Sequence, residues 1–248
     1  MKRDVIAKLK ILMDCFTGYR TQILMYHNIS DDLQDPWSVS QEEFAAQMDW
    51  LKKRGYSVLS LSQVLADFLA GKVRRKSIVL TFDDGYSDFL KNAVPVLKMY
   101  AFPAVLFVIA GETGGVSHWR MPGLQRPLLN WEEIREVVKL GHEIGSHGLH
   151  HRDLTSISPE DLKTEITVSK RLIENNIGTL VYAFSYPWGK YNARVKNTIQ
   201  EAGYCCAVKV GSKLGNGPET NRFHLQRLTM CRSDSLADFA RKVDRICL

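Results

Sequence analysis

Apolar residues along this chain fall into two patterns, short continuous runs and longer segments with helical spacing. The clearest continuous run covers residues 77–82 and is followed at once by Asp83, Asp84 and Gly85. Such a run predicts a strand that is covered on both faces, as in a parallel sheet. Because an unpaired buried charge is costly, we expect both aspartates at the carboxyl end of this strand, where α/β folds place their reactive groups.

The rest of the chain alternates between the same two patterns. Apolar runs predict further strands over residues 22–26, 56–59, 104–109, 180–185, 204–208 and 225–230, and a short strand or turn over 143–147. Helical spacing predicts helices over residues 40–55, 60–69, 130–140, 158–175, 192–202 and 235–246, and one after Gly85 that Pro95 should kink or divide. Residues 111–127 lack periodicity and predict a loop over the active face.

The order of these elements predicts the fold class. Strands alternate with helices, and no linker-like stretch divides the chain. We therefore predict a single α/β domain over residues 1–248, with a largely parallel, barrel-like sheet. Within it, residues 22–248 would form the barrel and residues 1–18 an amphipathic helix.

Charge and composition narrow the function classes. The net charge is +6, but the only dense basic run, residues 72–76, contains no aromatic residue. Nucleic-acid binding needs a basic face interleaved with aromatic rings, so we do not expect it. A solvated connector explains the run best, with anionic phospholipid or a sugar phosphate as the functional alternative.

Two further features bear on location. The five cysteines are odd in number and have no metal-type spacing, which favours a reducing compartment and predicts a cytoplasmic protein. Lys8, Lys10 and Asp14 interrupt the apolar stretch of residues 1–18, so this segment does not resemble a secretion signal. It either packs on the domain or lies on a membrane surface as a peripheral contact, and no stretch is typical of a transmembrane span.

A pair of histidines supplies candidate chemistry. His147 and His151 are four residues apart, so on a helical turn both rings would point the same way, whereas His150 would not. Two imidazoles plus a carboxylate from another strand end make a three-ligand metal site with an open position, as in catalytic zinc centres. The alternatives are two surface histidines, and an Asp84 that merely caps the following helix.

The segments 81–85 and 143–151 together resemble the polysaccharide deacetylase (NodB-homology) family, carbohydrate esterase family four. The similarity extends from about Ile23 to Met230. It implies a distorted (β/α) barrel, a divalent metal that is usually zinc, and hydrolysis of an N-acetyl or sometimes O-acetyl group on a saccharide. By position, Asp83 would be the catalytic base, and the metal ligands would be Asp84, His147 and His151.

The chain departs from the family pattern in two places. The third motif normally carries an arginine that holds the base aspartate, but residues 184–189 contain none, and Arg227 is our candidate replacement. The late Leu-x-His motif, which supplies the catalytic acid, is also absent from residues 225–228. His224 is close to it but two residues from a useful position.

The segment Leu24-Met25-Tyr26-His27 resembles a permuted branch of the family, which includes biofilm poly-N-acetylglucosamine deacetylases. In that branch the acid histidine lies on an N-terminal strand, which makes His27 the candidate acid. His27 would sit at the carboxyl end of a strand, where a barrel active site opens. A purely structural histidine is the alternative.

The segment 186–188 adds candidate substrate contacts. The backbone N–H of Trp188, which follows Pro187, would stabilise the oxyanion, and the rings of Tyr186 and Trp188 would stack on a sugar. Trp50 and Trp131 should pack in the core. We predict a metal-dependent deacetylase of an N-acetylated saccharide. The alternatives are an amidase on a small non-sugar amide and a non-catalytic saccharide-binding module.

Overall fold

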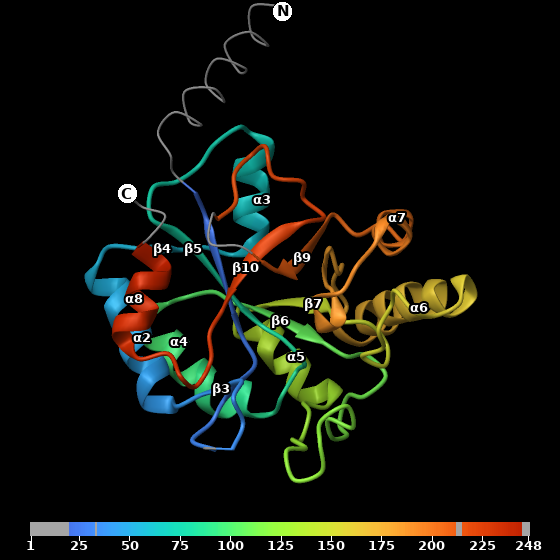
Figure 1. Ribbon diagram of the computed structural model, residues 1–248, viewed down its shortest axis with the longest axis horizontal. Helices are drawn as coiled ribbons and strands as arrows, with labels where there is room; N and C mark the ends of the chain where they lie inside the picture. Colours follow the sequence, from blue (N-terminus) through green and yellow to red (C-terminus); the bar gives the residue numbers. More distant parts are fainter. Residues whose placement is uncertain (1–19, 33, 212–214, 245–248) are drawn as a thin grey trace, which may run out of the picture.

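The computed structural model describes residues 20–32, 34–211 and 215–244, and its centre is a barrel of parallel strands (Figure 1). Seven described strands pair in the order β1, β10, β9, β8, β7, β6 and β5, and the ring closes because β1 also pairs with β5. These strands are β1 (Gln22–Tyr26), β5 (Ser77–Phe82), β6 (Val105–Val108), β7 (Glu143–Ser146), β8 (Ala183–Ser185), β9 (Cys206–Val210) and β10 (Leu225–Thr229). The predicted α/β barrel is confirmed, while the helix expected over residues 1–18 lies outside the described residues.

Helices surround the barrel on its outer face (Figure 1). Helices α2, α4 and α8 pack on one side, and α5, α6 and α7 form a second group. Their bounds are α2 (Gln41–Lys53), α3 (Leu61–Leu69), α4 (Val94–Tyr100), α5 (Trp131–Lys139), α6 (Pro159–Ile177), α7 (Ala193–Glu201) and α8 (Leu236–Asp244). None of the described helices combines the length and apolarity that a membrane span requires.

Strand alternation divides the apolar residues between two cores. On β5, Ile78, Leu80 and Phe82 join the core beneath the helices, while Val79 belongs to the core inside the barrel. Successive side chains of a strand point to opposite faces, so the inward series of β5 continues from Val79 through Thr81 to Asp83. The interior is therefore apolar in its lower part and becomes polar at the carboxyl ends of the strands.

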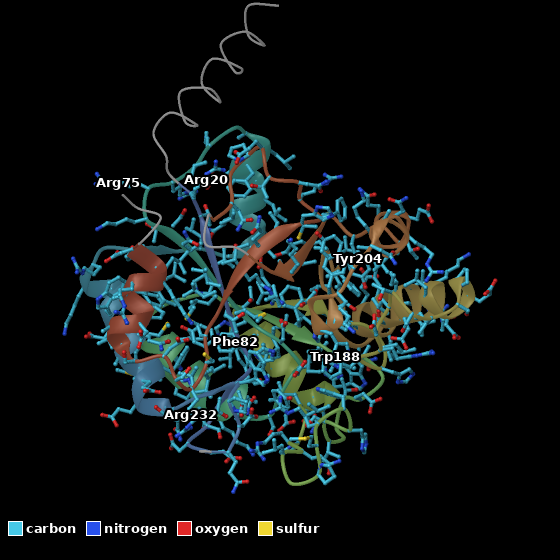
Figure 2. The ribbon with its side chains drawn as sticks, viewed as in Figure 1. Arg20, Arg75, Phe82, Trp188, Tyr204 and Arg232 are labelled. Carbon is cyan, nitrogen blue, oxygen red and sulfur yellow. The ribbon has the colours of Figure 1, made fainter. Side chains whose placement is uncertain are left out.

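The other end of the barrel is closed by α3. Leu61 and Val64 of this helix pack into the same interior core as the barrel strands. Glu143, at the start of β7, accepts hydrogen bonds from the backbone N–H of Leu61 at 3.0 Å and from the hydroxyl of Tyr182 at 2.6 Å. Because α3 covers the amino ends of the strands, a ligand can reach the inward-facing side chains only at the carboxyl ends. Figure 2 labels residues at both ends, with Arg20 just before β1 and Arg232 beyond the end of β10.

Several local features differ from the sequence predictions. A two-residue parallel pair, β2 (Asn28–Ile29) and β3 (Ser38–Val39), lies between the strand predicted over 22–26 and the helix predicted over 40–55, where no element was predicted. β4 (Ser57–Val58) is shorter than expected. The helix before Pro95 is a π-helix, η1 (Phe89–Ala93), and α4 starts one residue before this proline, so the expected division is present. Trp50 and Trp131 pack against the core as predicted.

Candidate active site

A cavity of about 410 Å³ opens at the carboxyl ends of the barrel strands. His27 follows β1, Asp83 follows β5 and His147 follows β7, and each lines this cavity. Each side chain continues the inward-facing series of its own strand. Parallel pairing brings these strand ends to one edge of the sheet, which is why residues far apart in sequence meet here.

Asp83 is held by a buried fork of hydrogen bonds. Arg227 Nη1 donates to Asp83 Oδ1 and Arg227 Nη2 to Asp83 Oδ2, both at 2.7 Å, and Ser185 Oγ donates to Oδ2 at 3.1 Å. The Arg227 side chain is fully buried. Burial alone would raise the pKa of Asp83, but the charge and hydrogen bonds of Arg227 outweigh it and hold that pKa well below its usual range. Asp83 is therefore ionised, and its carboxylate is held in one orientation by hydrogen bonds.

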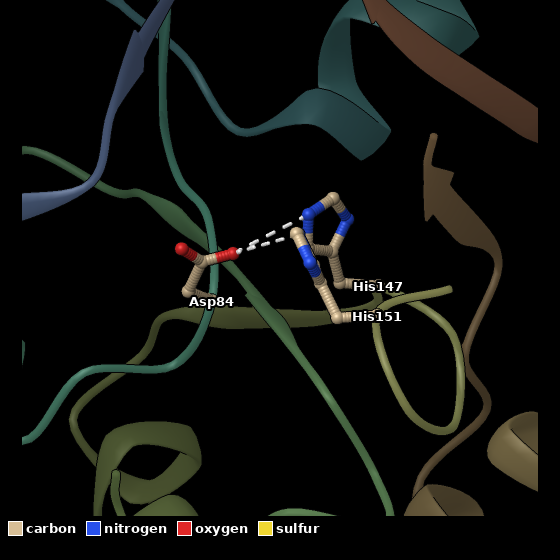
Figure 3. A group of neighbouring side chains, drawn as sticks. All are labelled: Asp84, His147 and His151. Carbon is tan, nitrogen blue, oxygen red and sulfur yellow. Dashed lines mark ion pairs between the residues drawn. The ribbon is translucent and has the colours of Figure 1, made fainter. Parts of the chain in front are cut away.

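Asp84 turns the other way. Its backbone is left-handed, with φ of 76°, so its carboxylate leaves the direction of Asp83 and faces the two histidines. Figure 3 shows this group, in which Asp84 Oδ1 lies 3.4 Å from His147 Nε2 and 3.5 Å from His151 Nε2. Asp84 Oδ1 is buried and has no hydrogen-bond donor among the described residues. The following helical segment begins at Phe89 with Asp88, not Asp84, at its N-cap, so the capping alternative for Asp84 is wrong.

The two histidines converge, but not on a helical turn as expected. Residues 147–151 form an irregular turn after β7, with left-handed backbone at Gly148 (φ 84°) and His151 (φ 54°). Beneath it, Glu165 Oε2 of α6 accepts the backbone N–H groups of Leu149 at 2.9 Å and of His150 at 3.0 Å. The spacing of four residues correctly predicted that the two rings converge. The reason was wrong, because the chain forms an irregular turn here and not a helical one.

Both histidines are neutral at ordinary pH. Burial lowers the pKa of His147 to about 4 and the pKa of His151 to about 3, more than nearby carboxylates raise them. His147 Nδ1 lies 2.9 Å from the Ser185 carbonyl, which can only accept, so Nδ1 carries the proton and Nε2 presents its lone pair. A lone pair facing a carboxylate oxygen at 3.4 Å is repulsive unless something positive lies between them.

This donor set fits a divalent cation. The candidate ligand atoms of Asp84, His147 and His151 all lie within 4.8 Å of one another, and all three residues are buried. Two neutral imidazoles and one carboxylate match the three-ligand set of catalytic zinc sites. His150 is directed elsewhere, with its Nδ1 3.1 Å from Glu112 Oε1.

The two candidate acid histidines occupy different places. His27 lines the cavity, its Nδ1 is buried without a partner among the described residues, and its ring lies 5.5 Å from that of Trp37. His224 precedes β10, at the opposite end of this strand from the cavity, and its ring lies 4.7 Å from the ring of Tyr191.

The predicted substrate contacts are only partly placed at the cavity. Trp188 lines it, is 53% exposed, and has left-handed backbone (φ 60°) in the short 3-10 helix η2 (Pro187–Gly189). Tyr186 touches the cavity wall but is 1% exposed, and its ring stacks on Tyr191. This packing therefore gives no support to the predicted stacking of Tyr186 on a sugar. Pro187 is buried and lies outside the cavity lining.

Sequence reasoning assigned no role to three residues that shape this site. Ser185 holds both Asp83 and His147, and its position at the end of a strand was the available signal. Glu165 interrupts the apolar face of α6, where a carboxylate among buried residues signals a specific partner. Trp119 gave no signal, because it lies in the loop without periodicity.

Comparisons with known proteins find a family model, sequences and solved structures that are similar to this chain. The family model described as polysaccharide deacetylase matches residues 70–207, a segment that includes Asp83, Asp84 and both histidines of the cluster. The YxkH protein of Bacillus subtilis, which is itself assigned to the polysaccharide deacetylases, is 33% identical over 187 residues. The matched part is 75% of this chain and 63% of that protein, so the chain spans less than two thirds of this relative.

Two further proteins are similar over most of the chain. The poly-beta-1,6-N-acetyl-D-glucosamine N-deacetylase of Staphylococcus aureus strain MSSA476 is 27% identical over 220 residues, covering 85% of this chain and 73% of that protein. The solved structure of the Streptococcus pyogenes deacetylase PplD in complex with acetate superposes with a TM-score of 0.79 at 25% identity. This superposition covers 90% of the present chain and 98% of PplD.

Proposed function

The chain belongs to the polysaccharide deacetylase family, and from that premise we propose that it removes N-acetyl groups from an amino-sugar glycan in a metal-dependent hydrolysis. The observation that carries the proposal is the juxtaposition, at one cavity, of an arginine-held carboxylate and a separate Asp-His-His cluster. A saccharide-binding module would need neither. The name of the Staphylococcus aureus relative supports poly-N-acetylglucosamine as the first glycan to test.

Each polar residue of the site has a task in amide hydrolysis. A divalent ion, for which zinc is our first choice, would be held by Asp84, His147 and His151 and would polarise the substrate carbonyl and lower the pKa of water. Asp83 takes the proton of the attacking water, as a general base must be ionised and aimed. Arg227 keeps Asp83 in that state, since it stabilises the charged carboxylate in a buried place.

His27 supplies the proton that the leaving amine needs, which is the arrangement of the permuted branch. The support is positional. Tyr26 and Phe82 are paired across β1 and β5, and Asp83 N donates to the Tyr26 carbonyl at 3.0 Å, so His27 and Asp83 leave neighbouring strands at the same level. His224 lies at the other end of its strand, away from the cavity.

Trp188 completes the site in two ways. Its backbone N–H is the candidate donor to the developing oxyanion, and its ring is exposed enough to support a sugar. Trp37, 42% exposed, lines the same cavity near His27. The cavity volume falls in the range of roughly 300–1,000 Å³ typical of ligand pockets. Exposed indoles at the rim favour a glycan that extends beyond the cavity.

The test uses the zinc-loaded full chain and β-1,6-linked N-acetylglucosamine oligomers, with products followed by mass spectrometry. We expect stepwise loss of acetyl groups, and an Asp83→Asn variant that keeps its metal but loses activity by roughly two to four orders of magnitude. Hydrolysis of small amides with untouched oligosaccharides would favour the amidase alternative. Loss of metal in Asp83→Asn would mean that the two aspartates have each other's role.

A further inference from the structure

The two histidines of the cluster are oriented by different means. His147 donates its Nδ1 proton to the Ser185 carbonyl, which fixes the ring by a hydrogen bond. His151 Nδ1 is buried and has no hydrogen-bond partner among the described residues. Histidines that bind metals usually donate their second ring N–H to a carboxylate or a carbonyl, and this contact orients the ring. His151 therefore needs another source of orientation.

Two indoles enclose the His151 ring. Trp119 stacks on it, with the ring centroids 4.7 Å apart and the planes at 28°, and Trp188 meets it edge-on at 4.6 Å and 60°. Trp188 is held beside the ring by a hydrogen bond to the same residue, because its Nε1–H donates to the backbone carbonyl of His151 at 3.0 Å. The ring of His151 is thus held between two aromatic surfaces, of which Trp119 is the one from the 111–127 loop.

That loop is tied to the segment after β1 by two ion pairs. Arg120, the neighbour of Trp119, pairs with Asp35, whose side chain is fully buried, and Arg126 pairs with Asp32. Asp35 Oδ2 also accepts from Asn28 Nδ2 at 2.8 Å, and Asn28 is the residue after His27. The position of Trp119 is consequently fixed by contacts outside the cluster that it touches.

We propose that Trp119 is a positioning residue for His151, so that the seating of the 111–127 loop and the metal affinity of the cluster are energetically coupled. The proposal rests on the metal site of the proposed function. Removing Trp119, or releasing it by breaking the Arg120–Asp35 pair, allows the His151 ring to rotate and weakens metal binding. Linkage is reciprocal, so a bound ion must in turn favour the seated loop by the same factor.

The experiment measures zinc affinity by competition with a chromophoric chelator. Trp119→Ala should lower the affinity roughly 10- to 100-fold, the usual effect of losing an outer contact to a metal ligand. Arg120→Gln should lower it in the same direction, and Trp119→Phe should restore most of it, since a phenyl ring keeps the stacking surface. Met121→Ala is the matched control, because Met121 lies in the same loop, is 70% exposed and should leave zinc affinity unchanged.

A second measurement follows amide hydrogen exchange with and without zinc. We expect zinc to slow exchange in residues 111–127 of the native chain and to have no such effect in Trp119→Ala. If Trp119→Ala folds and binds zinc as tightly as the native chain, the positioning role is overturned while the proposed function stands. If the native chain itself binds no divalent ion, the metal site and this proposal fail together.

Discussion

The guanidinium of Arg227 donates two hydrogen bonds of 2.7 Å to the carboxylate of Asp83, which lies 144 positions earlier in the chain. Both side chains face into the barrel, from β10 and from the end of β5, with β1 lying between these strands. Breaking such a buried pair leaves an uncompensated charge, which typically costs about 3–5 kcal/mol. A substitution that keeps the charge is therefore the informative one.

Arg227→Lys should reduce activity roughly 10- to 100-fold and move the acid limb of the pH–rate profile to higher pH. Burial raises the pKa of Asp83 and Arg227 lowers it, so a weaker partner lets that pKa rise. Asp83 must be ionised to accept a proton, hence activity is lost at a higher pH on acidification. The profile of kcat/KM against pH measures this shift, and an unmoved acid limb would show that Arg227 does not tune Asp83.

The cluster of Asp84, His147 and His151 should bind one divalent ion. His147→Ala and Asp84→Ala should each lose it, because two remaining ligands hold zinc poorly. Elemental analysis after dialysis gives the stoichiometry. His150→Ala is the control, since this neighbour contacts Glu112 instead, and it should keep the full metal content. Stoichiometric metal in either ligand variant would refute the assignment.

His27→Ala should damage amide hydrolysis far more than hydrolysis of an activated acetate ester. An amine must be protonated as it leaves, whereas a phenolate leaves without help. The same change at His224 should matter little for either substrate, because His224 lies at the far end of β10. Parallel rates on both substrates provide the comparison. Equal loss on both in His27→Ala would indicate a structural role, and a selective loss in His224→Ala would restore the usual late-histidine arrangement.

Glu165→Ala should lower the free energy of unfolding by about 2–3 kcal/mol, because it leaves the amides of Leu149 and His150 without their acceptor. Metal affinity should fall with it, since the turn that carries both histidines loosens. Thr164→Ala, at the exposed neighbouring position, should change stability by less than about 0.5 kcal/mol. Denaturant unfolding measures both variants, and equal stabilities would remove Glu165 from the support of this turn.

Asp88→Asn should stabilise the protein at alkaline pH and have little effect at acid pH. Burial, with the charge of Asp35 nearby, raises the pKa of Asp88 to about 7. Between the unfolded and folded pKa values the native state binds a proton that the unfolded state releases, so stability falls as pH rises. Asparagine removes this penalty, which a shift of roughly three pKa units places at about 4 kcal/mol above the folded pKa. Melting temperatures across pH would contradict this if the native and variant curves stayed parallel.

Much of the fold was predictable from local sequence. The helices predicted to start at residues 40 and 130 are capped by Ser40 and Asn130, whose side chains are typical of N-caps, and β1 and β5 begin where their apolar runs begin. Such features are encoded within a few neighbouring residues. The strands β2 and β3 were missed because two residues each carry no periodicity, and their pairing depends on a distant contact.

The sequence predicted which residues form the site better than it predicted the backbone conformation that brings them together. Motif spacing brought Asp83, Asp84, His147 and His151 together, but the turn that joins the histidines depends on left-handed backbone at His151, which spacing does not specify. The role of Trp119 could not be predicted, because its loop has no hydrophobic periodicity and its position depends on ion pairs with another segment. Contacts between segments far apart in sequence leave little trace in either one.

Strand β1 has a consequence for synthesis on the ribosome. Its Leu24 pairs with Leu80 on one side and with Leu228 on the other, so the ring of strands cannot close until the last strand has emerged. Until then β1 exposes an unpaired edge, which is a target for chaperones and for aggregation. Asp83 also lacks its guanidinium until that moment. The hydrolytic centre therefore forms only after β10 has been synthesised, and a nascent chain without β10 stays inactive.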